Sequence, residues 1–146
     1  MNYWILKTEP STYSFDDLRR EQTTVWDGVK NPVALKHLRA MQHGDEVLVY
    51  HTGDEKAVVG RARVTKAAYP DPKQKHPRLV VVELTAGARL PAPVTLATIR
   101  ADAKFRDLPL VRMPRLSVQP VSAEQWKRLV QLGGGAGGGG GGFRSR

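Results

Sequence analysis

A short polar run near the start of the chain carries side chains suited to recognising a polar ligand. Lys7, Thr8 and Glu9 follow one another at the end of an apolar segment. If that segment is a strand, its two-residue period places Lys7 and Glu9 on one face and Thr8 on the other. A lysine ammonium can contact a phosphate or a base oxygen, and a carboxylate can accept from an exocyclic amine. An ordinary surface pair beside a strand end is the alternative.

Trp26 is the aromatic residue whose position best fits a binding site. It directly precedes Asp27-Gly28, a dipeptide typical of turns. A nucleobase taken out of its strand needs a flat apolar surface, and stacking on one contributes about 1–3 kcal/mol. A tryptophan buried in the core is the alternative reading of Trp26. Trp4, inside a predicted strand, and Trp126, on a predicted amphipathic helix, are expected in the core.

The charge of the chain favours an anionic partner. Its 146 residues include 23 Lys and Arg against 14 Asp and Glu, a net charge of +9. Nucleic acid is the commonest partner of so basic a chain, and a basic surface that only serves solubility is the alternative. Basic residues that could form a groove for phosphates are Arg61, Arg63, Lys66, Lys73, Lys75, Arg78, Arg112 and Arg115. Those predicted to contact phosphates are Arg61, Arg63, Lys66, Arg78, Arg112 and Arg115.

Composition also excludes several classes of site. The chain has no cysteine, so structural disulfides, thiolate metal sites and cysteine nucleophiles are all excluded. Its histidines, at positions 37, 43, 51 and 76, show no metal-ligand spacing, and neither a metal nor a cofactor is predicted. No apolar run approaches the roughly 20 residues of a membrane span and no signal peptide is recognisable. We therefore expect a soluble, cytoplasmic protein, with a monomer favoured.

The elements that must position these side chains alternate between strands and helices. Strands are predicted at residues 3–8, 23–26, 46–52, 58–65 and 78–85, with extended pieces at 108–112 and 115–119. Helices are predicted at 15–20 after Ser14, from Asn31-Pro32 to Gly44, after Thr95 to about 103, and from Ser122 onward. Pro91 and Pro93 are expected to interrupt the chain.

This pattern predicts an α+β fold that is mainly β. Short strands with helical inserts favour a small curved sheet or barrel of about five to six strands, with helices packed around it, over a doubly wound parallel sheet. Residues 1–132 are expected to form one domain. From Gly133 the sequence is nearly pure glycine, so residues 133–146 are expected to be a flexible tail.

Several spaced segments together resemble one known family. They are Tyr3-Trp4-Ile5-Leu6-Lys7-Thr8-Glu9-Pro10, Trp26-Asp27-Gly28-Val29-Lys30-Asn31, Ala34, Leu38-Arg39-Ala40-Met41, Gly44-Asp45, Tyr50-His51-Thr52, Val59-Gly60, Tyr69-Pro70-Asp71 and Arg115-Leu116-Ser117-Val118-Gln119-Pro120. This set resembles the EVE domain, a member of the PUA-like superfamily, over about residues 2–132. The EVE domain is similar to the YTH domain, which reads N6-methyladenosine in RNA.

The resemblance implies a module that flips a modified base, such as 5-methylcytosine, out of DNA or RNA and holds it in an aromatic pocket. The pocket residues that it implies are Trp26, Lys7, Thr8, Glu9, Asp27, Asn31, Tyr50, His51 and Ser117. Two of them have a second reading, because Asn31 can simply cap a helix and Asp27 can simply shape its turn.

Two other functions stay open at this point. Other PUA-like domains, of the ASCH type, include amidohydrolases that remove acyl groups from modified cytidine with a Lys, Thr and Glu set. Thr8 points away from Lys7 and Glu9 on a strand, so another threonine, such as Thr52, would have to supply the nucleophile. No catalytic residue is predicted here. A protein-interaction module, marked by an exposed apolar patch, is the third possibility.

Overall fold

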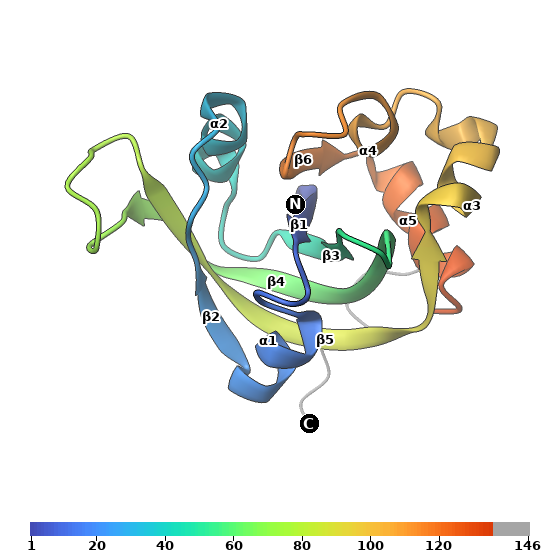
Figure 1. Ribbon diagram of the computed structural model, residues 1–146, viewed down its shortest axis with the longest axis horizontal. Coiled ribbons are helices and arrows are strands. Elements are labelled where there is room, and N and C mark those ends of the chain that lie inside the picture. Colours follow the sequence, from blue (N-terminus) through green and yellow to red (C-terminus); the bar gives the residue numbers. More distant parts are fainter. Residues whose placement is uncertain (136–146) are drawn as a thin grey trace.

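Six strands make up the centre of the fold in the computed structural model, which describes residues 1–135 (Figure 1). The strands are β1 (Tyr3–Thr8), β2 (Thr23–Trp26), β3 (Glu46–His51), β4 (Ala57–Pro70), β5 (Val80–Thr95) and β6 (Val118–Val121). The helices are α1 (Phe15–Glu21), α2 (Pro32–Ala40), α3 (Leu96–Ala101), α4 (Pro109–Arg112) and α5 (Ala123–Leu132), with a 3-10 turn, η1 (Ala103–Phe105).

The strands form one open, mixed sheet in the order β2-β5-β4-β3-β1-β6. β1 pairs with β3 in parallel, and every other neighbouring pair is antiparallel. This confirms the predicted α+β class, and of the two predicted forms it is the curved sheet rather than a closed barrel. Within residues 1–135 no helix has both the length and the apolar character that crossing a membrane requires.

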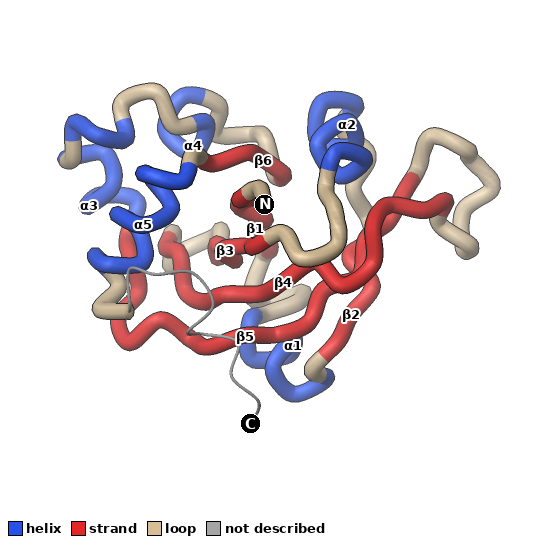
Figure 2. Tube along the Cα trace, turned by 180° about the vertical axis from the view of Figure 1, so that it is seen from behind, coloured by secondary structure: helices blue, strands red, loops and turns tan. Residues whose placement is uncertain are grey.

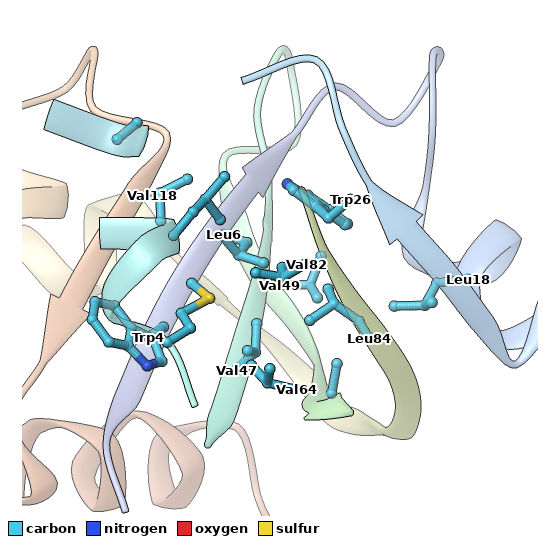
Figure 3. Close-up of a cluster of buried hydrophobic side chains, with 14 of the residues drawn as sticks. Trp4, Leu6, Leu18, Trp26, Val47, Val49, Val64, Val82, Leu84 and Val118 are labelled. Atoms are coloured by element: carbon cyan, nitrogen blue, oxygen red, sulfur yellow. The ribbon is translucent and has the colours of Figure 1, made fainter. Parts of the chain in front are cut away.

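The core lies on both faces of this sheet, because side chains along each strand alternate between them. Trp4 and Leu6 of β1 pack with buried residues of α1 and α2 (Figure 3). Ile5, between them in sequence, packs instead with Trp126 and other residues of α3 to α5. We call these the α1/α2 face and the α5 face. Trp4 and Trp126 are thus core residues, as expected.

Four predicted helix starts have the capping contacts that stabilise them, including Thr95, whose Oγ1 accepts from the Thr98 backbone at the start of α3. The Ser14 side chain accepts from the Asp17 backbone and the Asp17 side chain accepts from the Ser14 backbone, which is a capping box. Asn31 caps α2, with Pro32 at the first helical position. Ser122 Oγ accepts from the backbone of Gln125 at the start of α5. Local polar residues therefore determine where these helices begin.

Two predicted stretches take another form. β5 continues through Pro91 and Pro93, which were expected to interrupt the chain, because β4 and β5 lose regular pairing between Gly60–Arg89 and Val58–Val94. Proline is tolerated there because a bulge removes the need for a backbone N–H donor. Residues 109–112 form helix α4 rather than an extended piece, since Pro109 sits at a helix start, where its missing N–H is not needed.

The first three residues of the expected tail contact the fold. The carbonyl of Gly133, a buried residue, accepts from the Ala92 amide of β5 at 3.0 Å, and the Gly135 amide donates to the Val130 carbonyl at 2.9 Å. Residues 133–135 therefore complete the end of α5 against β5. The rest of the expected tail, residues 136–146, lies outside the described residues.

Candidate binding site

A cavity of about 340 Å³ opens between the start of α2 and the loop that joins α4 to β6. It is lined by Asn31, Val33, Met113, Pro114, Arg115 and Leu116. Val33 and Met113, which are 45% and 48% exposed, are two of only four large hydrophobic side chains exposed among the described residues. Exposed apolar side chains that converge on one cavity favour a binding site there. We call this cavity the α2 pocket.

Asn31 lies at the edge of the α2 pocket with its two side-chain groups in different situations. Its Oδ1 accepts from the amides of Val33 and Ala34, at 2.9 and 3.0 Å, and so caps α2. Its Nδ2 has no acceptor among residues 1–135 and remains a potential donor. Capping and ligand contact, the two readings of Asn31 from the sequence, are therefore compatible.

Lys7 joins the end of β1 to the pocket loop from the α5 face. Its Nζ donates to the Pro114 carbonyl at 2.6 Å and lies 5.6 Å from the centre of the Tyr50 ring. Its backbone amide donates to the Ser117 carbonyl at 2.9 Å. Burial lowers the pKa of the Lys7 ammonium. Lys7 thus holds the Pro114 and Ser117 carbonyls, and its side chain points away from that of Thr8.

Thr8 and Glu9 point into the loop that precedes α1. Thr8 Oγ1 donates to the Tyr13 carbonyl at 2.6 Å. Glu9 accepts from the Ser11 amide at 2.6 Å and from the Ser11 hydroxyl at 2.8 Å. These two bonds, the amide first, lower the pKa of the Glu9 carboxyl. Lys7, Thr8 and Glu9 therefore do not converge on one point.

Trp26 lies on the α1/α2 face, 8% exposed, in the same cluster of core residues as Leu116 of the pocket (Figure 3). Its ring meets the edge of the Tyr13 ring at 6.1 Å and 86°. Its Nε1 has no acceptor among the described residues, whereas Trp4 Nε1 donates to Asp45 at 3.0 Å. Trp26 is thus largely a core residue, yet it keeps an unused donor. Asp27, next in the chain, is exposed.

Tyr50 and His51 are buried and take structural positions. His51 Nε2 accepts from the Phe15 amide at the start of α1, at 2.9 Å, and His51 Nδ1 lies 2.7 Å from Glu55 Oε1. Tyr50 belongs to the α5-face core, where burial raises the pKa of its phenol. Neither residue lines the α2 pocket.

The basic residues predicted to contact phosphates differ in exposure. Arg61 is only 3% exposed, 3.2 Å from Glu46 Oε1 and stacked over the Trp126 ring at 5.6 Å. The predicted phosphate contact of Arg61 is therefore wrong, because Arg61 is buried in the core. The alternation of residues along β4 indicates that Arg61 and Arg63 share a face, but it does not indicate whether that face is covered. Arg63 is half-buried, and the exposed members of the predicted set are Lys66, Arg78, Arg112 and Arg115.

The apolar walls of the α2 pocket were missed from the sequence. Val33 did carry a signal, because it falls outside the stripe of Ala34, Leu35 and Leu38 that packs α2 onto the sheet. Met113 carried none, since its exposure depends on α4, where an extended piece was expected.

The comparisons with known proteins agree with one another. The family model of the EVE domain matches residues 2–132. A crystal structure of an Agrobacterium tumefaciens protein is 34% identical, with a TM-score of 0.90, and the match covers 93% of this chain and 95% of that one. Human THYN1, crystallised in complex with DNA containing 5-methylcytosine, is 27% identical, with a TM-score of 0.84 and coverage of 91% and 98%.

Relatives known by sequence also match most of this chain. Rat thymocyte nuclear protein 1 is 28% identical over a match that covers 90% of this chain and 73% of the relative. A more distant likeness, to an ASCH protein from Zymomonas mobilis, is 11% identical with a TM-score of 0.54, and it concerns the fold alone.

Proposed function

Because the chain belongs to the EVE domain family, we propose that it is a nucleic-acid-binding module that reads a modified base, with the α2 pocket as its reading site. The observation that carries the proposal is the human THYN1 complex with DNA containing 5-methylcytosine, a structure with which this chain shares its fold and 27% identity. The net charge of +9 supports an anionic partner.

The dimensions and chemistry of the α2 pocket suit a flipped base. Its volume of about 340 Å³ falls within the range of small-molecule sites, about 300–1,000 Å³. Val33, Met113 and Leu116 offer apolar contact to a base methyl group, a contribution of about 0.8 kcal/mol per buried carbon group. Asn31 and Arg115 both line the pocket, where the Asn31 amide would donate to a base edge and the Arg115 guanidinium to the flanking phosphate.

Trp26 does not itself line the α2 pocket, and in this proposal a base would reach it only through the core cluster beside the pocket. Its cluster includes Leu116, and its unpartnered Nε1 could donate to a base that enters between α2 and the pocket loop. An indole that is 8% exposed offers an edge more readily than a whole stacking face. In this proposal the aromatic wall is therefore partial, and Val33 and Met113 supply the remaining apolar surface.

The geometry favours binding over amide hydrolysis. A nucleophilic Thr8 would need its hydroxyl proton removed by a nearby base, but its hydroxyl donates to the Tyr13 carbonyl. Glu9 has its carboxylate held by Ser11, and a carboxyl with a lowered pKa is a weak general base. The hydroxyl of Thr52, the other candidate, faces the Thr8 carbonyl at 3.4 Å.

Fluorescence anisotropy with matched oligonucleotides tests the proposal. The double variant Val33→Ala/Met113→Ala should lose most of the preference for a 5-methylcytosine probe over its unmethylated counterpart, because it removes both exposed apolar walls. Val25→Ala is the matched control, since Val25 is 44% exposed on β2 and does not line the pocket. A folded double variant that keeps the full preference would exclude the α2 pocket as the reading site.

A further inference from the structure

We propose that α2 and the loop between β4 and β5 together form a basic track that holds the sugar-phosphate backbone several nucleotides away from the α2 pocket. The track consists of Lys36, Arg39, Lys73, Lys75 and Arg78, all of them exposed. It rests on the proposed function, because it assigns a second contact to the same nucleic acid. Lys73, Lys75 and Arg78 were among the basic residues that the sequence offered for a phosphate groove, whereas Lys36 and Arg39 were not.

The loop part of the track is a protruding, uniformly basic segment. Residues 72–78 are all exposed, and no Asp or Glu occurs between Asp71 and Glu83. In Figures 1 and 2 this loop extends beyond the rest of the sheet on the side of α2. Cations with no nearby carboxylate raise the local positive potential, which attracts a polyanion.

Backbone contacts give the loop a defined shape. The Asp71 carboxylate, itself buried, accepts from the Lys73 amide at 2.9 Å, and the Asp71 amide donates to the Leu79 carbonyl at 2.9 Å. The acid at the base of the loop is thereby turned inward, while Lys73 and Lys75 project from the exposed part. A preformed loop loses less conformational entropy on binding than a flexible one.

Arg39 connects the loop to α2. Its Nη2 donates to the Arg78 carbonyl at 2.7 Å, which places the end of the loop beside the last turn of α2. α2 contains no acidic residue. Val33, Lys36 and Arg39 are three residues apart, so they are successive neighbours along the side of the helix. The basic track thus leads from the pocket wall at Val33 to the loop.

The track cations differ from several other basic residues of the surface. Arg20, Arg89 and Arg128 each pair with an aspartate, Asp17, Asp16 and Asp102 respectively. Among residues 1–135, none of the five track cations forms an ion pair with a carboxylate. Their charge is therefore available to an external anion.

Helix geometry sets the spacing between base and track. At about 1.5 Å per residue, the six residues from Val33 to Arg39 span about 9 Å along the helix axis. Along one strand of a duplex the phosphates follow each other at about 3.4 Å of axial rise. The contacts of the loop, which lies beyond Arg39, should accordingly begin about three nucleotides from the base held in the pocket.

The test removes the loop charges from the full chain with Lys73→Gln, Lys75→Gln and Arg78→Gln together. Binding to a duplex with one central 5-methylcytosine and at least six flanking base pairs on each side is measured over a series of salt concentrations. The slope of log affinity against log salt concentration should decrease in magnitude by about 2–3, because each lost phosphate contact removes about 0.9 from that slope. The preference for the methylated probe should not change.

A control of equal charge separates the track from net charge. Arg100→Gln, Lys104→Gln and Lys127→Gln together remove three exposed cations from α3, η1 and α5. This control should keep the wild-type salt dependence. Equal losses in the two triple variants, or an unchanged slope in the loop variant, would overturn the track.

The two proposals fail in different ways. A wild-type chain with no preference for the methylated probe, but with a slope that depends on the loop charges, would refute the pocket and leave the track. If the wild type prefers the methylated probe but the loop variant has the same salt dependence as the wild type, only the track is refuted. A duplex cut to two base pairs on each side of the modified base should bind the wild type and the loop variant equally.

Discussion

Asn31 combines two roles that one substitution can separate. Serine also caps helices well, so Asn31→Ser should keep the melting temperature near that of the wild type. The same change removes the Nδ2 donor, and affinity for a modified oligonucleotide should fall by about 5- to 30-fold, a loss of about 1–2 kcal/mol.

Asn31→Ala is the comparison, because it loses the cap as well. Its free energy of unfolding should be lower by about 1 kcal/mol, which lowers its melting temperature. Anisotropy and thermal melting on the same samples decide between the roles. Wild-type affinity in Asn31→Ser would limit Asn31 to capping α2.

Trp26 needs a substitution that retains most of its volume and its aromatic character, because its side chain is mostly in the core. Trp26→Ala would leave a cavity and cost about 3–5 kcal/mol of stability. Trp26→Phe keeps an aromatic ring on the α1/α2 face and removes only the outer ring and the Nε1 donor. We expect this variant to fold, to bind nucleic acid in general, and to lose several-fold of its preference for the modified base.

The result is read by titrating modified and unmodified probes under identical salt conditions. A folded Trp26→Phe protein with the wild-type preference would show that the Nε1 donor has no part in reading. Trp4→Phe is unsuitable as a control, because its Nε1 donates to the buried Asp45.

Residue chemistry could be predicted from the sequence only where the partner is local. The Asn31 cap joins residues two and three apart, and the sequence predicted it. Lys7 donates to a carbonyl 107 residues away, and His51 accepts from an amide 36 residues away. No local pattern reveals such partners, so Lys7 and His51 were predicted as ligand contacts while their partners stayed unknown.

At the scale of elements, α1 is held by a capping box that depends on an ionised carboxylate. Bonds from Ser14, the backbone amide first, lower the pKa of Asp17 below its ordinary value of 3.8. A lowered carboxyl pKa contributes stability that is complete above the ordinary value and is lost as the pH falls through the lowered value. Asp17→Asn should therefore be less stable than the wild type at neutral pH, with the difference shrinking below about pH 4.

Urea unfolding at a series of pH values measures this difference. Asp54→Asn, in the exposed turn between β3 and β4, is the matched control and should follow the wild type throughout. A difference for Asp17→Asn that stays constant from neutral pH to pH 2 would show that ionisation of this cap does not contribute.

The contact between α1 and β4 depends on a glycine. A Cβ atom built at Gly60 would overlap the ring of Phe15, the first residue of α1, which is fully buried. Gly60→Ala should cost about 1–3 kcal/mol of unfolding free energy, because overpacking forces the ring or the backbone to shift. Adding Phe15→Leu should recover part of this loss in chemical denaturation. No recovery would mean that the strain lies elsewhere.

The sequence identified elements well where polar caps and alternation coincide, as at β1, α1, α2 and α5. It failed where long-range pairing overrides a local signal. β5 passes through Pro91 and Pro93 because β5 itself bulges there, with residues 90–93 between the partners of Gly60 and Val58. β4 was not expected to continue to Pro70. Tertiary pairing of this kind leaves no periodicity in either strand alone.

Across the whole molecule, the two faces of the sheet differ, because the α2 pocket opens on one face and the other face is covered by core packing. Asn31, Val33 and Leu116 bring the α2 pocket to the α1/α2 side, while the core of the α5 face holds Tyr50 and Arg61. The family resemblance indicated the general fold and a nucleic-acid partner. It did not indicate which implied residues share a face, because that depends on the register of β1 between β3 and β6.

The position of β1 also determines when the protein can finish folding on the ribosome. β1 emerges first but has β3 on one edge and β6 on the other, with Leu6 opposite Val118. Until residues 118–121 leave the exit tunnel, one edge of β1 stays unpaired and the Pro114 carbonyl that Lys7 binds has not been delivered. Such long-range closure is slow compared with local hairpins. A nascent chain that has completed β5 would therefore hold most of the sheet but lack the α2 pocket, which forms only after residues 113–121 have been added.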